Sequence, residues 1–335
     1  MADRQQVRLT NKYMRVTRIN KKAGKVGQTW VWIVAILTVG IWAETFVSSK
    51  ILINNGLAPA DIFLYRFIIA YVAIWIVSPK TVWSRTLLDE LRLMSLGITG
   101  GSLYFLTENT AIKYSTASNV AILVESAPLL TTLLVAIFYK EERISARQTI
   151  GSFIAITGMI LVILNGQIVL KLNPIGDTLA VGAALSWAIY SIILRQISEK
   201  YNIVFITRKV FLYGLLTIIP YFIFIKPLNH DTTLLCKPVV WIILAYLGLI
   251  ASMTCFVTWN WALRRLGTVR TTNLIYGQCI FTMLTANIVL GERITWMAVI
   301  GTVILITGML LAIKSNPDNG QKPCGKGDKT SQSGQ

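Results

Sequence analysis

Three carboxylates lie inside long apolar stretches of the sequence: Glu44, Glu108 and Glu125. A carboxylate at the centre of a membrane-spanning helix costs about 2.5 kcal/mol or more, so we expect these side chains to face a polar interior and not lipid. In such a cavity a carboxylate is suited to bind a cationic or amine-bearing solute, or to take up and release a proton. The alternative is structural, with each carboxylate hydrogen-bonded to Arg66, Asn109 or a hydroxyl group and holding two helices together.

Arg66 is the one cation that lies deep inside a predicted span, and we expect it to form a gating or structural ion pair and not to contact a solute. Aromatic side chains supply the walls that a cavity needs, because their faces are apolar and their π electrons attract cations. The alternative position for an aromatic residue is the belt at the membrane surface. The aromatic residues that we expect at the solute site are Trp42, Trp187, Tyr190, Trp259 and Tyr276.

These residues must be positioned by helices that cross a bilayer, and the composition agrees with that requirement. Hydrophobic residues make up 54% of the 335 residues and charged residues only 14%, whereas about a quarter of a soluble domain is charged. Several stretches approach the ~20 apolar residues that span a bilayer. The sequence therefore predicts an all-α integral membrane protein with ten transmembrane helices, at residues 29–53, 61–78, 93–112, 117–138, 148–165, 177–197, 207–226, 239–260, 270–290 and 296–314.

The net charge of +17 is concentrated in the N-terminal tail (1–28), in alternate loops and near the C-terminus. Because cytoplasmic loops carry the excess of Lys and Arg, this distribution indicates membrane topology and not a nucleic-acid partner. We expect a multi-pass protein of the plasma membrane, the inner membrane in a bacterium, with both termini in the cytoplasm. The tail at 315–335 is rich in Gly, Lys, Ser and Gln and is predicted to be disordered. The loops expected on the cytoplasmic side are those near 80–92, 140–147, 195–208 and 264–270.

The sequence repeats itself. IGSFIAITGMILVI at 150–163 recurs as IGTVILITGMLLAI at 300–313, and YFLTENTAIKY at 104–114 recurs as CFVTWNWALRR at 255–265. The second match aligns Asn109 with Asn260 and Glu108 with Trp259, which adds both asparagines to the expected solute site. A unit of five spans crosses the membrane an odd number of times, so its second copy enters from the opposite side. We therefore predict two inverted five-helix repeats, 29–165 and 177–314, around one central site.

In combination these motifs resemble the EamA-type carriers of the drug/metabolite transporter superfamily, over residues 28–315. The resemblance implies a ten-helix, two-repeat carrier with a central cavity and no use of ATP. Glu44 and Glu125 depart from it, since such carriers more often have small neutral residues there. Cys279 stands where a proline usually matches Pro128, which leaves open whether the ninth helix bends like the fourth. The matching pieces include Trp42, Arg66 after Pro59, YFLTEN, TASNVAI, Ala127-Pro128, Glu142-Arg143, CFVTWN and LGERITW.

Enzymatic readings find no support in the sequence. The single histidine, His230, falls in a predicted outer loop, and no G-x-S-x-G, HExxH or phosphate-binding glycine loop occurs in the predicted folded part. We expect no enzymatic activity, no cofactor and no metal site.

The function that we expect is secondary-active transport of a small organic metabolite, such as an amino acid or amine, by alternating access, with export favoured. The alternative is a membrane receptor or scaffold that keeps the carrier fold without transporting anything. The expected partners are the solute, the lipid bilayer and protons as the coupling ion, and assembly into a homo-oligomer is left open.

Overall fold

The computed structural model describes residues 27–79, 83–115, 117–139, 145–164, 173–225, 227, 237–281, 284 and 294–313, and every regular element in these ranges is helical. Several predictions lie outside the described residues. They concern the tail before residue 27, the tail after residue 313, Glu142-Arg143, Lys171 and His230.

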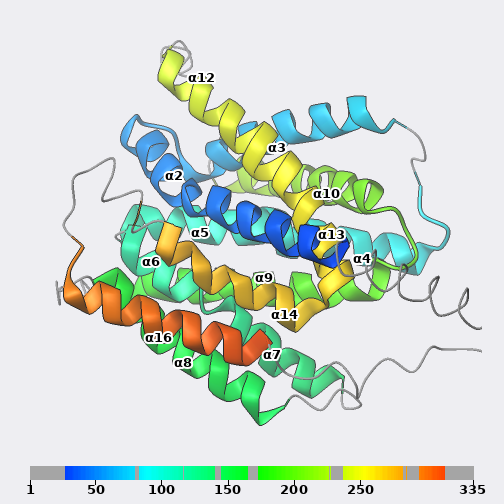
Figure 1. Ribbon diagram of the computed structural model, residues 1–335. Coiled ribbons are helices and arrows are strands. Elements are labelled where there is room, and N and C mark those ends of the chain that lie inside the picture. The colour runs from blue at the N-terminus through cyan, green and yellow to red at the C-terminus, as the bar shows by residue number, and fades with distance from the viewer. Residues whose placement is uncertain are drawn as a thin grey trace, which may run out of the picture.

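Within the described ranges, six helices are long and apolar enough to cross a bilayer, which confirms the prediction of an all-helical, multi-pass membrane protein. Large apolar side chains cover their outer faces; Phe224, for example, is 82% exposed and Ile76 is 73% exposed. Lipid is the environment that such surfaces require. The six helices are Gly27–Asn54, Pro59–Val77 (α3), Pro174–Ile197 (α9), Ile203–Phe224 (α10), Pro238–Leu266 and Trp296–Ile313 (α16), as Figure 1 shows.

Turns and non-α segments interrupt several helices. A turn at Glu44 separates residues 27–43 from α2 (Thr45–Asn54), and a second turn at Glu125 and Ser126 separates α6 (Ala117–Val124) from α7 (Ala127–Phe138). Further along, α14 (Thr268–Thr272) continues into the 3₁₀ segment η3 (Asn273–Gly277). The ninth predicted span therefore departs from α geometry without a proline.

A π-helical segment occurs at the same place in each half of the chain. In the first half, η1 (Ile98–Ser102) joins α4 (Leu87–Gly97) to α5 (Leu103–Tyr114). In the second half, η2 (Tyr246–Thr254) joins α12 (Pro238–Ala245) to α13 (Cys255–Leu266). The halves also pack crosswise, because α3 lies against η2 while α10 lies against η1 and α4. Inserted π turns are frequent at functional sites.

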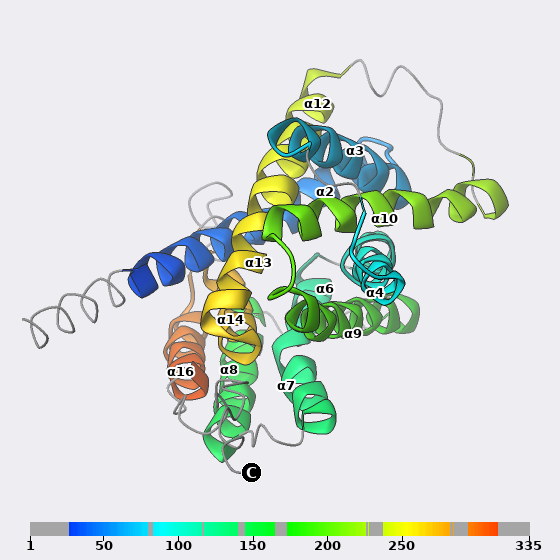
Figure 2. The same ribbon diagram turned by 90° about the vertical axis from the view of Figure 1, so that its right-hand side faces the viewer.

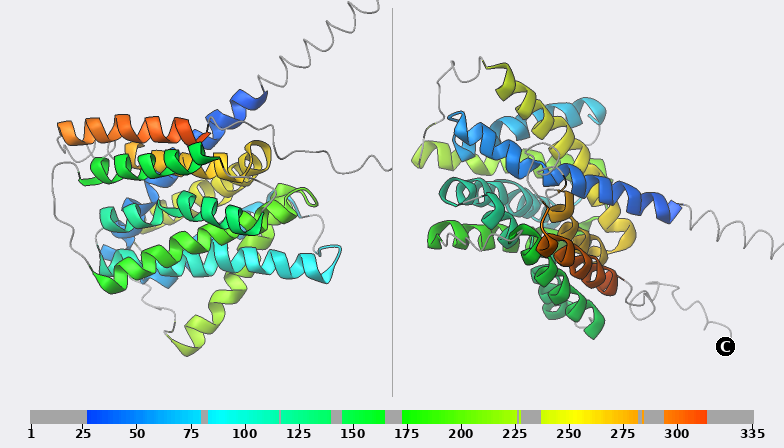
Figure 3. Two further views of the ribbon diagram at one scale, coloured as in Figure 1. Left: turned by 90° about the horizontal axis from the view of Figure 1, so that it is seen from below. Right: turned by 60° about the vertical axis from the view of Figure 1, so that its left-hand side comes forward.

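Four glycines allow α8 (Ala146–Leu164) to lie directly against α16. The two helices run side by side in Figures 1, 2 and 3. The contact is reciprocal: Gly151 meets Gly308, and Gly158 meets Gly301. Small residues permit this close approach of helix backbones within a membrane.

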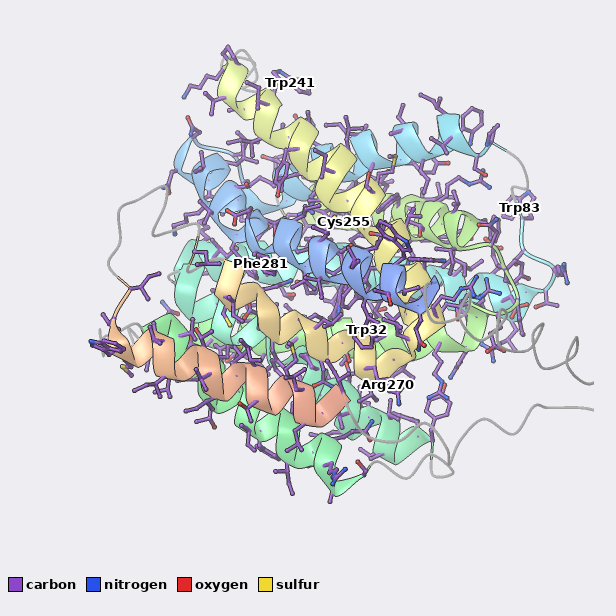
Figure 4. All side chains as sticks on the ribbon, viewed as in Figure 1. Trp32, Trp83, Trp241, Cys255, Arg270 and Phe281 are labelled. Atoms are coloured by element: carbon purple, nitrogen blue, oxygen red, sulfur yellow. The ribbon has the colours of Figure 1, made fainter. Side chains whose placement is uncertain are left out.

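Exposed tryptophans occur at the periphery of the molecule. Trp241 lies at the top and Trp83 at the right of Figure 4, and they are 45% and 72% exposed. Tryptophan is enriched at membrane surfaces, so these residues fit an aromatic belt. The tryptophans expected at the solute site, Trp42, Trp187 and Trp259, are buried and do not belong to that belt.

We predict that Gly151→Ala loosens the contact between α8 and α16. A Cβ at Gly151 would lie 2.7 Å from the backbone oxygen of Gly308, too close without a shift of one helix. Overpacking of this kind costs about 1–3 kcal/mol, which a lower melting temperature of the purified protein in detergent should report. Gly182→Ala in α9 is the control, because no atom lies within 4 Å of that added Cβ. Equal melting temperatures for the two variants would contradict the packing argument.

Candidate functional site

A cavity of about 40 Å³ lies between the two halves of the chain. This volume has room for about three water molecules. The first half supplies Trp42, Thr45, Phe46, Tyr104, Phe105, Glu108, Val124 and Ala127 to its lining, and the second half supplies Trp187, Phe256, Ile275 and Gln278. We call this space the central cavity.

Glu108 is the acidic residue of the cavity lining. It lies on α5, one turn beyond Tyr104, whose hydroxyl donates a hydrogen bond to its Oε1 at 3.2 Å. The Glu108 side chain is buried, and none of the ion pairs within 4 Å in the described part of the chain involves it. Its carboxylate is therefore held by one neutral donor at the surface of the cavity.

Arg66 joins the two halves close to Glu108 without forming a direct ion pair in the described part of the chain. Its Nε donates to the Ser252 hydroxyl of η2 at 2.9 Å, and its guanidinium lies 4.2 Å from the ring centroid of Phe105. The charges of Arg66 and Glu108 attract each other over a longer distance. These contacts fit a structural role for Arg66 in holding α3 against η2.

The aromatic wall is built around Trp42. Its ring centroid lies 5.3 Å from that of Trp187 and 5.1 Å from that of Trp259, and its Nε1 donates to the carbonyl of Ala251 at 2.8 Å. Trp42 and Trp187 line the central cavity, while Trp259 and Tyr190 lie outside its lining. The indole nitrogens of Trp187 and Trp259 are buried and have no hydrogen-bond partner among the described residues.

The matched asparagines hold helices together and do not line the cavity. Asn260 accepts from the Tyr190 hydroxyl at 2.7 Å and donates to the Thr207 hydroxyl of α10 at 3.0 Å. Asn109 donates to the carbonyl of Pro59, at the start of α3, at 3.4 Å. Each asparagine thus fastens its helix to α10 or α3, the second helix of its own half.

The remaining predicted residues occupy different places. Glu44 is half-buried in the turn before α2, between cavity-lining Trp42 and Thr45, but is not itself part of the lining. Glu125 is 1% exposed in the turn between α6 and α7, beside the cavity-lining residue Val124. Tyr276 packs away from the cavity, in a cluster with residues of α8 and α16.

The sequence does not predict the cavity-lining residues Tyr104, Phe105, Phe256 and Gln278 at the solute site. The repeat contained a signal for two of them, because it aligns Phe105 with Phe256 and both line the cavity. Tyr104 has Cys255 as its counterpart, so the repeat gave no reason to select it. Gln278 precedes Cys279, the counterpart of Pro128. Its own counterpart is therefore Ala127, which also lines the cavity, but neither residue belongs to a repeated motif.

A charged network closes the end of the molecule where α4 and α10 begin, on the right of Figure 1. Glu90 pairs with Lys209 and accepts from the Tyr213 hydroxyl, while Asp89 accepts from Lys200 at 3.1 Å. The carboxylates come from the first half and the cations from the second. We call this network the basic-end latch; it consists of Asp89, Glu90, Lys200, Tyr201, Lys209 and Tyr213.

The latch is suited to stay charged at physiological pH. Burial of the Glu90 carboxylate raises its pKa, but hydrogen bonds from Lys209, Ser84 and Tyr213 outweigh burial and lower the pKa to about 2. A free glutamate titrates near pH 4.3, so Glu90 remains ionised at any pH above that value. A change of pH near neutrality will not open the latch.

The chain is similar to the EamA-like transporter family along residues 29–164 and again along 174–314. A probable amino-acid metabolite efflux pump of Escherichia coli (strain K12) is 28% identical, over 84% of this chain and 94% of the relative. A probable terminal-alkyne amino-acid exporter of Streptantibioticus cattleyicolor is 26% identical, over 84% and 92%. A solved crystal structure has a TM-score of 0.68 at 16% identity, over 84% of this chain and 97% of that one, which shows a shared fold.

We predict that charge reversal on one side of the latch destabilises the protein and that reversal on both sides restores part of the loss. Breaking a buried ion pair costs about 3 kcal/mol, so Glu90→Lys and Lys209→Glu should each lower the melting temperature. The double variant should melt above either single variant. Lys200→Gln is the control, because its side chain is 50% exposed and such pairs contribute less than about 1 kcal/mol. A double variant no more stable than the single variants would rule out a specific pair.

Proposed function

Because the chain belongs to the EamA-like transporter family, we propose that it is a secondary-active carrier that exports a small organic amine or amino acid. The observation that carries this proposal is Glu108, a buried carboxylate at the surface of a central cavity with aromatic walls. A carboxylate attracts an ammonium group, and the faces of Trp42 and Trp187 offer it cation–π contact. The relatives whose names mention amino-acid efflux or export support the same solute class.

The indole nitrogens favour a solute that carries an acceptor as well as an amine. The Nε1 of Trp187 belongs to a cavity-lining residue and has no partner among the described residues. A buried donor without a partner is costly, so a solute that supplied an oxygen there would gain a hydrogen bond. An amino acid has both groups. This supports amino acids over simple amines within the proposed solute class.

The size of the cavity supports alternating access. About 40 Å³ is far smaller than the roughly 300–1,000 Å³ of ligand pockets, so a solute enters only if helices move apart. The latch joins the halves at one end of the molecule, where it would have to break for that end to open. In our proposal, opening at the two ends alternates.

We further propose that the chain forms ten transmembrane helices as two inverted repeats, 29–165 and 177–314. The double match to the family supports this arrangement. The paired π segments and the crosswise packing of α3 and α10 support it too. Finally, the reciprocal contacts of Gly151 with Gly308 and of Gly158 with Gly301 are the pattern that a two-fold axis generates.

Transport is tested by counterflow in proteoliposomes. Vesicles containing the purified protein are loaded with one unlabelled amino acid or amine at a time and exposed to a trace of the same labelled compound. A carrier accumulates the label transiently inside, and empty vesicles do not. If no compound of either class shows counterflow, the proposed solute class is wrong, and a receptor or scaffold becomes the better reading.

We predict that Glu108→Gln lowers the counterflow rate about tenfold or more. Glutamine keeps the size of the side chain but not its charge, and a hydrogen bond to a charged group is worth about 1.5–3 kcal/mol, or a factor of 10 to 100. Glu199→Gln is the matched control, since Glu199 is exposed at the basic end. An unchanged rate for Glu108→Gln at matched abundance would assign Glu108 to helix packing.

We also predict that the latch end faces the cytoplasm, because positive charge gathers there. In a variant without the native cysteines, Arg85→Cys should resist a membrane-impermeant thiol reagent in intact cells and react after lysis. Lys237→Cys, exposed at the opposite end, should react in intact cells. The reverse pattern of labelling would invert the orientation.

A further inference from the structure

The turn between α6 and α7 is held by its own backbone and not by the Glu125 side chain. The Ser126 amide donates to the Leu123 carbonyl at 3.3 Å, and the Ser126 hydroxyl donates to the same carbonyl at 2.6 Å. Pro128 follows and has no N–H to offer to Val124. The local fold therefore gives no reason for a carboxylate at position 125.

The Glu125 carboxyl group is buried, and one of its two oxygens has no hydrogen-bond partner among the described residues. The residue is 1% exposed, and the oxygen without a partner is Oε2. None of the ion pairs in the described part of the chain includes it. An ionised carboxylate in such a place is strongly disfavoured, so the closed structure accommodates the neutral acid.

Two titratable side chains of the described part of the chain lie near enough to interact with the charge of Glu125. They are the Tyr104 phenol, from α5, and the Cys279 thiol, from the segment after η3. The other elements that pack on α6, namely α2, α8 and α9, contribute no charged group to this contact. Tyr104 also donates its hydroxyl hydrogen to Glu108. Its phenol therefore interacts with the cavity carboxylate and with Glu125.

We propose that Glu125 is a proton-binding site, distinct from the solute site at Glu108, and that it couples proton movement to transport. The proposal rests on the proposed function. The neighbours of Glu125 in the chain, Val124 and Ala127, line the central cavity, so expansion of the cavity brings water to the turn. The O–H bond of the acid then breaks, the proton passes to water, and the electron pair remains on the carboxylate. Without a solute, the carboxylate must regain a proton before the cavity closes. With a solute bound, its ammonium group compensates the charge of the carboxylate, so the cavity closes with Glu125 ionised. Release of the proton on the side where the solute binds, and uptake on the side where the solute leaves, then move one proton per cycle against the direction of the solute.

A proton fits this place better than a metal cation. A cation such as Na⁺ needs several oxygen ligands, as the six to eight of Ca²⁺ illustrate. Glu125 has apolar neighbours in Val124 and Ala127, and the described residues contain no group of three His, Cys, Asp or Glu side chains able to hold a metal ion. A sodium-driven carrier is the alternative that the test below separates.

The first test measures proton binding itself and needs no solute. Infrared spectra of the purified protein near neutral pH should contain the carbonyl band of a buried, protonated carboxylic acid. Because Glu108 is also buried, the contribution of Glu125 is read from the difference between the spectra of wild type and Glu125→Gln, which should contain the band, whereas the difference for Glu199→Gln, at an exposed carboxylate, should not. A Glu125→Gln difference spectrum without a carboxylic-acid band would overturn the proposal whether or not the protein transports anything.

The second test separates coupling from transport. It uses the labelled amino acid or amine that gives the strongest counterflow with the wild type. Glu125→Gln should keep counterflow close to wild type, yet lose accumulation driven by an imposed pH gradient; Glu108→Gln should lose both. Accumulation by Glu125→Gln under a pH gradient, or by the wild type under a sodium gradient at clamped pH, would contradict the proposal. If wild type shows no counterflow, the proposed function fails and the infrared test alone decides whether Glu125 binds a proton.

Glu125→Ala is a second variant, which keeps the test decisive if Glu125→Gln does not fold. It removes the carboxyl group without adding a polar amide, so it should lose the infrared band and the gradient-driven accumulation in the same way. Both variants are compared only when they elute as monodisperse protein and their melting temperatures lie close to that of the wild type. A folded Glu125→Ala variant that still accumulates solute under a pH gradient would count against the proposal as directly as the glutamine variant would.

Discussion

Lipid offers no hydrogen bonds, and this constraint organises the whole molecule. Every polar group at membrane depth must find its partner inside the protein, so Asn109, Asn260 and Arg66 each bind a neighbouring helix. These bonds hold the interior while apolar side chains cover the outside. Some buried groups of the described residues are exceptions. Three of them, Oε2 of Glu125 and the indole nitrogens of Trp187 and Trp259, lie at or near the central cavity, while Asn109, Tyr139 and Tyr276 each have an unpartnered oxygen away from its lining. A solute or a proton that binds near the cavity can form the hydrogen bonds that these groups lack.

Much of the fold could be predicted from the sequence, because hydropathy records which stretches lie in lipid. The repeat could be read as well, since its motifs survive in both halves. Which side chains reach the cavity could not be predicted, because the hydrogen-bond partners of a polar side chain lie on helices distant in the sequence. The sequence predicts Tyr276 and the two asparagines at the solute site, but Tyr276 packs against residues of α8 and α16, and the asparagines bond to α3 and α10. Gln278 lines the cavity, yet it belongs to no repeated motif.

The structure places a rigid contact and a breakable one in different parts of the molecule. Backbone touches backbone between α8 and α16, where glycines leave no side chain to rearrange. The latch between α4 and α10 instead consists of long side chains that can separate and be hydrated. The central cavity lies among other helices, lined by residues such as Glu108 on α5 and Trp187 on α9. In the proposed transport cycle, opening a path to Glu108 would therefore break the latch and keep the glycine contact.

Glu108 and Trp259 occupy matched positions in the two halves, yet one is a carboxylate and the other an indole. If the two halves were identical and inverted, each could adopt the conformation of the other. The carrier would then change from inward-open to outward-open without a change in free energy. Substitution of a charge by an aromatic ring at one of the two positions removes that equality. The resting orientation of such a carrier is then set by the differences between its duplicated halves, before any solute or ion gradient acts on it. Divergence of the two halves after duplication can thus give a carrier of symmetric architecture one preferred resting orientation.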